Sequence, residues 1–199
     1  MAKKHIHHFR TVLLIVGLVM LVIAIGVMIR QTFTRGVPSQ VVPASIPASA
    51  PFKISSPVFD TNGQIPTAYT CNGQKISPPL AIQNPPSNTK EFVLIVRDST
   101  AQDKVHWLLW NIPADTTNIS ENGIPTDAIQ GTNDFNTMAF EPFCVQPEDT
   151  ARHQYIFELY ALNETIDLTA NATKDSIKVA INGKIITKVQ MTGALTTPQ

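Results

Sequence analysis

A run of eighteen apolar residues without a charge, VLLIVGLVMLVIAIGVMI at positions 12–29, constrains this chain most. Its length is close to the roughly 20 residues that a helix needs to cross the hydrocarbon core of a membrane. A cleavable signal usually has a shorter apolar stretch followed closely by a small-residue cleavage site, whereas Arg30 and Gln31 follow here. The sequence therefore predicts a short N-terminal segment, 1–11, and an uncleaved transmembrane helix over 12–29.

The charges that flank the apolar run predict its orientation. Lys3, Lys4 and Arg10 precede it, whereas Arg30 and Arg35 follow it. Because cytoplasmic flanks carry the excess of Lys and Arg, a cytoplasmic N-terminus is favoured. We therefore expect a single-pass inner-membrane protein whose folded domain faces the periplasm.

Residues 30–51 are predicted to form an extended linker. The segment VPSQVVPASIPASAP contains four prolines, which prevent a helix or a central strand. Ala48-Ser49-Ala50 resembles a cleavage site some twenty residues beyond the apolar run, so removal of the anchor there is the alternative to an intact chain.

The remaining residues, 52–199, are enough for one domain with a single core. Fifteen prolines and many Thr, Asn and Val residues suit short strands and turns, and suit a helical bundle poorly. Fifteen basic and fifteen acidic residues cancel, so the net charge does not call for a nucleic-acid partner. We expect a mainly β fold with little helix.

Three segments, Phe92–Val96, Val105–Ile112 and Gln154–Leu162, are apolar runs of the length of a buried strand. In the last one, alternation places His153 and Tyr155 on the same face. A histidine and a phenol should therefore share one surface at the start of that strand.

A short helix and a final strand are expected near the C-terminus. Thr173 can cap a helix that buries Ile177, and Gly183 is a natural stop. Residues 185–192 then have the character of a strand.

The common catalytic signatures are absent from the sequence: there is no G-x-S-x-G elbow, P-loop, G-x-G-x-x-G, H-E-x-x-H or paired C-x-x-C. The sequence therefore predicts no enzyme, no metal and no cofactor. Four polar residues remain near strand ends, where pockets often form: Asp98, His106, His153 and Tyr155.

Four segments, in order, resemble blocks of the phosphatidylethanolamine-binding protein family, in its bacterial Raf-kinase-inhibitor-like subgroup. They are YTCNGQKISPPLAI at 69–82, RDSTAQDKVHWLLWNIP at 97–113, GTNDF at 131–135 and RHQYIFELYAL at 152–162. The resemblance covers residues 52–195. It implies a central antiparallel β-sheet, a small C-terminal helix and a shallow surface pocket for anions such as phosphate or a phospholipid head group.

Carried over by the resemblance, the pocket would use Asp98, His106, His153 and Tyr155. Imidazole and phenol groups can donate hydrogen bonds to anion oxygens. An ionised Asp98 would repel an anion, so we expect it to orient or charge a neighbouring histidine. The alternatives are a satisfied strand histidine at 106, a packing role for Tyr155, and an Asx turn at Asp98.

The family segment G-P-C-P-P is replaced here by PFCVQ at 142–146. The pocket wall would therefore contain Pro142 and a bulky Phe143. Cys71 and Cys144, the only cysteines, lie in family blocks expected at one end of the domain. In an exported domain we expect them to form a disulfide worth roughly 4 kcal/mol; the alternative is two separate buried thiols.

Three functions compete. The first is a membrane-anchored binding or regulatory protein for an anionic small molecule or phospholipid head group. The second is an inhibitor of a protease or a kinase that acts through protein contacts. The third, ranked last, is a hydrolase that uses His106 or His153 as a general base.

Overall fold

The computed structural model describes residues 2–33 and 50–196, and the side chains of residues 12–28 within the first helix. The chain divides into two compact units, residues 1–47 and 48–199. Most of the predicted linker, 34–49, lies outside the described residues.

The first unit contains one helix, α1 (Ala2–Phe33), which includes nearly all of the segment 1–11 that the sequence set apart. Among the described residues, no helix is both long enough and apolar enough to cross a membrane. The transmembrane anchor predicted for residues 12–29 is therefore not supported.

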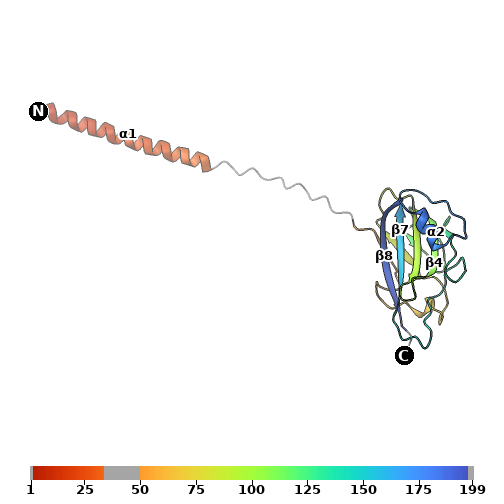
Figure 1. Ribbon diagram of the computed structural model, residues 1–199. Helices are drawn as coiled ribbons and strands as arrows, with labels where there is room; N and C mark the ends of the chain where they lie inside the picture. The colour runs from red at the N-terminus through yellow and green to blue at the C-terminus, as the bar shows by residue number, and fades with distance from the viewer. Residues whose placement is uncertain (1, 34–49, 197–199) are drawn as a thin grey trace. The chain divides into compact units, whose positions relative to one another are not determined.

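The second unit contains two antiparallel sheets (Figure 1). The larger sheet has the order β6-β4-β3-β7-β8, with β3 (Glu91–Asp98), β4 (Lys104–Pro113), β6 (Ile129–Gln130), β7 (His153–Leu162) and β8 (Ile185–Leu195). The smaller sheet has the order β1-β2-β5, with β1 (Lys53–Ser55), β2 (Leu80–Gln83) and β5 (Asn118–Ile119). A 3-10 turn, η1 (Thr67–Tyr69), lies between β1 and β2. The expected mainly β fold with a central antiparallel sheet is confirmed.

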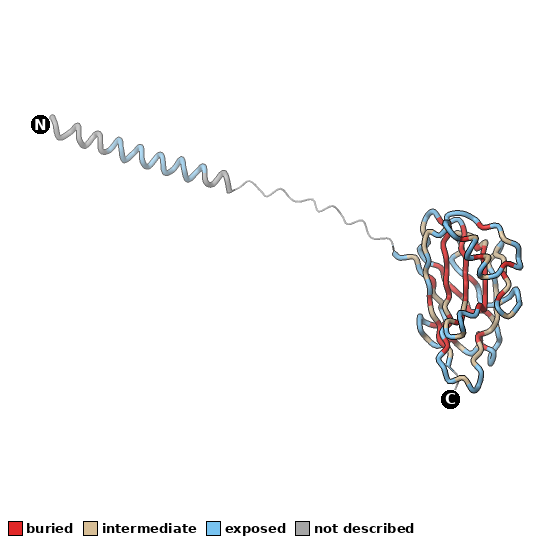
Figure 2. Tube along the Cα trace, viewed as in Figure 1, coloured by how far each residue is buried: buried red, intermediate tan, exposed pale blue. Residues whose placement is uncertain are grey.

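Apolar residues cover both faces of the larger sheet. On one face, Phe92 and Phe157 belong to a buried cluster that includes Ile82 of the smaller sheet. On the other face, Val93 clusters with Ile177 of the short helix α2 (Lys174–Ala180). Figure 2 shows the buried residues along the strands inside the domain. Because β3 is covered on both sides, its sequence is a continuous apolar run instead of an alternating one.

The C-terminal elements follow the predicted signals. The Thr173 side chain accepts a hydrogen bond from the backbone N–H of Ser176 and caps α2, and Gly183 adopts a positive φ of 79° beyond the end of the helix. Strand β8 continues to Leu195, three residues beyond the predicted 192, because it pairs with β7 along its whole length. This register places Gly193 opposite Tyr155.

Candidate functional site

The end of β3 and the start of β7 bring the predicted site residues together. Antiparallel pairing sets Asp98 opposite Tyr155, and the His106 ring of β4 lies 5.2 Å from the Tyr155 ring. The His153 ring stacks at 6.3 Å from the same tyrosine. Residues that are up to 57 positions apart in the sequence therefore form one cluster around Tyr155.

Asp98 holds His153 in place. Its Oδ2 lies 2.6 Å from Nδ1 of His153. Its Oδ1 accepts hydrogen bonds from the backbone N–H groups of Thr100, at 2.8 Å, and Ala101, at 3.2 Å. The sequence offered two roles for Asp98, an Asx-type turn and a partner for a histidine. The carboxylate has both contacts, because Oδ1 accepts the hydrogen bonds of the turn and Oδ2 contacts His153.

The other ring nitrogen of His153 faces a second carboxylate. Nε2 lies 2.9 Å from Oδ2 of Asp149, a residue of the loop before β7. Burial by itself would lower the pKa of His153, but hydrogen bonds to Asp98 and Asp149, and the charges of both carboxylates, outweigh burial and raise it. The hydrogen bond from His153 in turn lowers the pKa of Asp149. The two carboxylates therefore favour the protonated form of His153.

Sequence reasoning missed Asp149. Asp149 lies in a loop that shows no periodic pattern of apolar residues and belongs to none of the segments that resemble the family. It stands four positions before His153. That spacing was the only signal that could have indicated the contact.

The pKa of His106 shifts in the opposite direction to that of His153. It is buried, and its ring packs at 4.9 Å from Phe135 and 5.5 Å from Phe143. Its Nδ1–H donates to the carbonyl oxygen of Glu141 at 3.0 Å. Burial lowers the pKa of His106, and the carbonyls of Glu141 and Pro142 offset this only in part. A neutral His106 with its Nδ1 occupied resembles the satisfied strand histidine that the sequence left as an alternative.

Phe143 packs against Tyr155. Its ring lies 4.3 Å from that of Tyr155, and both residues are completely buried. The Tyr155 hydroxyl donates to the carbonyl of Cys144 at 3.3 Å. Burial and the charge of Asp98 raise the pKa of Tyr155. Phe143 and Tyr155 therefore form one buried aromatic contact beside Asp98.

A disulfide between Cys71 and Cys144 fixes the segment that contains Pro142 and Phe143, as expected from the sequence. The Cα atoms of the two cysteines are 5.3 Å apart. Backbone hydrogen bonds support the bond on both sides, because Cys71 N–H donates to Phe143 O and Phe143 N–H donates to Tyr69 O.

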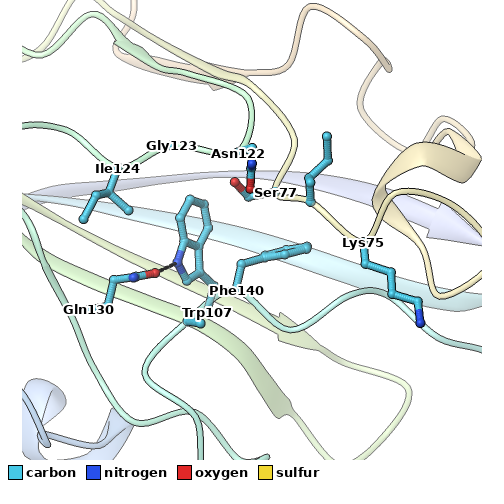
Figure 3. A pocket seen from close by; sticks show the side chains of 10 residues that line it. Lys75, Ser77, Trp107, Asn122, Gly123, Ile124, Gln130 and Phe140 are labelled. Carbon is cyan, nitrogen blue, oxygen red and sulfur yellow. Dashed lines mark hydrogen bonds between the residues drawn. The ribbon is translucent and has the colours of Figure 1, made fainter.

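Two cavities lie near the site, but neither is lined by Asp98, His106, His153 or Tyr155. The smaller, about 360 Å³, lies over Trp107 and Phe140, and Trp107 Nε1 donates to Gln130 Oε1 at 2.7 Å (Figure 3). The larger, about 580 Å³, is lined by residues 64–67, 70–72, 143–147 and 195–196. Both are assembled from loops that are distant in the sequence, so no local pattern predicted them.

In the part of the chain that the structure describes, no group of three or more His, Cys, Asp or Glu side chains is arranged to hold a metal ion. Asp98, His153 and Asp149 instead bind one another. A protonated His153 can donate charge-assisted hydrogen bonds to anionic oxygens, and both of its ring nitrogens here face carboxylates.

The fold and the site define a β-sheet domain with a histidine held by carboxylates at one end of its central sheet. The model of the phosphatidylethanolamine-binding protein family matches residues 55–196, and the chain belongs to this family. A UPF0098 protein of Methanothermobacter thermautotrophicus is 36% identical over 142 residues, which cover 68% of this chain and 92% of the relative. A UPF0098 protein of Pyrococcus horikoshii is 38% identical over 151 residues, 71% of this chain and 74% of the relative.

Two crystal structures are similar to this chain. A putative phosphatidylethanolamine-binding protein homologue from Chlamydia trachomatis has a TM-score of 0.66 and 31% identity, covering 72% of this chain and 95% of the homologue. YbcL of Escherichia coli, described as a member of the mammalian family, has a TM-score of 0.67 and 28% identity, covering 74% of this chain and 99% of YbcL.

Proposed function

We propose that this protein is a non-catalytic binding protein that recognises a phosphate-like anion at His153. One observation carries the proposal: an anionic oxygen, that of Asp149, already lies 2.9 Å from Nε2 of His153. A protonated imidazole at this position forms a charge-assisted hydrogen bond with a carboxylate, and a phosphate oxygen has the same requirements.

The electrostatics favour His153 over the other candidates as the donor to the anion. Asp98 lies 2.6 Å from Nδ1 and favours the charged ring. Burial lowers the pKa of His106 and so disfavours its charged form, and the Tyr155 hydroxyl is occupied by the carbonyl of Cys144. His106 and Tyr155 therefore form the wall of the site, and His153 binds the anion.

The same contacts support a binding role without catalysis. Both cysteines are joined in the disulfide, so neither is a nucleophile. Both nitrogens of His153 face carboxylate oxygens, and a doubly hydrogen-bonded imidazolium has no lone pair with which to remove a proton from water.

The test is a titration of the full-length chain with inorganic phosphate and, separately, with glycerophosphoethanolamine, the water-soluble form of a phospholipid head group. The ring resonances of His106 and His153 are followed by NMR. We expect saturable shifts of His153, with smaller shifts of His106. Tighter binding of glycerophosphoethanolamine would identify a lipid head group as the source of the anion, and tighter binding of phosphate would identify the free ion.

The matched control is His153→Gln, which keeps a polar side chain and removes the cation. If His153 does not respond to millimolar concentrations of either anion, or if His153→Gln binds as well as the wild type, the proposed function is wrong.

A further inference from the structure

We propose that Asp149 is an internal ligand of this site: its carboxylate occupies the position on His153 that an external anion takes, and it must leave before that anion binds. The inference rests on the function proposed above. It adds a competitor that belongs to the chain itself.

The two carboxylates on His153 are held differently. The Asp98 side chain is 3% exposed, and it also accepts the two backbone hydrogen bonds of its turn. The Asp149 side chain is 40% exposed and reaches His153 from a loop. Asp98 is therefore part of the rigid end of β3, whereas Asp149 is the partner that can exchange with a ligand from solvent.

The loop that carries Asp149 can move as a unit. Residues 145–152 contain no helix or strand. Asp149 N–H donates to Gln146 O at 3.0 Å, and Ala151 N–H donates to Asp149 Oδ1 at 2.9 Å. Both bonds lie within the loop, so a movement of the loop as a unit does not require them to break.

The two ends of this loop are anchored. The disulfide holds Cys144 on one side, and Arg152 donates to the carbonyl of Asn62 at 2.8 Å on the other. Residues 145–147 line the cavity of about 580 Å³, so space adjoins the first part of the loop. The displacement of Asp149 therefore needs only a local movement between two fixed points.

The exchange preserves the charge pattern around His153. An incoming anion replaces one carboxylate, so the imidazolium keeps two charge-assisted hydrogen bonds. A group tethered by a short flexible segment competes at an effective concentration in the millimolar range. The apparent dissociation constant of the external anion rises by the reciprocal of the fraction of molecules in which Asp149 is displaced.

The decisive variant is Asp149→Asn. Its amide oxygen can still accept the hydrogen bond from Ala151 N–H, but the negative charge is gone. Glu148→Gln is the matched control, because it removes the neighbouring exposed carboxylate of the same loop. Phosphate affinity is measured by isothermal titration calorimetry on the full-length wild type and both variants, and on Asp149→Asn combined with His153→Gln.

We expect Asp149→Asn to bind phosphate about tenfold more tightly than the wild type, as for a site that is open about a tenth of the time. Glu148→Gln should match the wild type, and the double variant should not bind. Equal or weaker binding by Asp149→Asn would overturn the internal-ligand proposal and leave the anion site standing. If neither the wild type nor any variant binds phosphate, the proposed function itself fails, and the internal-ligand proposal fails with it.

Discussion

Removal of the Cys71–Cys144 disulfide should destabilise the folded domain strongly, because the bond closes a long loop. The two cysteines are 73 positions apart. In the chain-entropy model, a loop of this length lowers the entropy of the unfolded chain by about 15 cal/mol/K, which corresponds to about 4.4 kcal/mol at 25 °C. The bond also lies next to Phe143, whose ring packs against Tyr155, so loss of the bond removes a restraint beside this aromatic contact.

The assay is urea unfolding of the full-length chain and of Cys71→Ser combined with Cys144→Ser. For a slope of about 2 kcal/mol/M, the expected loss lowers the midpoint by about 2 M urea. Treatment of the wild type with a dithiol should produce the same decrease, and the double variant should not respond to the dithiol. A loss below about 1 kcal/mol would refute the reasoning, because it would mean that the cross-link hardly restrains the unfolded chain.

Two further perturbations test the site and its packing. Because the pKa of His153 is raised in the folded state, its contribution to stability is fully present below the unfolded pKa of about 6.5 and is lost as pH rises through the folded value. Asp98→Asn should lower the pKa of His153 and flatten this dependence in urea unfolding between pH 5 and pH 9; an unchanged profile would contradict the role of Asp98. Gly193→Ala should destabilise the domain by about 1–3 kcal/mol, since an added Cβ would lie 2.6 Å from a side-chain atom of Ile65. Gly123→Ala, whose nearest neighbour would be 3.4 Å away, is the control and should leave the melting temperature nearly unchanged.

The long strands could be predicted from the sequence because their burial is visible locally. The runs at 92–96 and 105–112 lie within β3 and β4, and the alternation around His153 and Tyr155 matches the burial of the first residues of β7. The short strands β1, β2, β5 and β6 contain two to four residues each, too few to show a period. Only pairing with neighbouring strands defines them.

The apolar run at 12–29 shows what such a pattern does not determine. The run predicted a helix, and α1 includes it, but the membrane span was not supported.

The sequence by itself indicated four residues of the candidate site, through family blocks that contain Asp98, His106, His153 and Tyr155, and it also indicated the disulfide. Tertiary structure alone decided that the pKa of His153 is raised and that of His106 lowered, since each depends on burial and on the carboxylates and carbonyls around the ring. Only the tertiary structure showed that the Asp149 carboxylate contacts the His153 ring. The carboxylates, carbonyls and rings that surround a side chain come from segments remote in the sequence, and only the folded chain brings them within hydrogen-bonding distance.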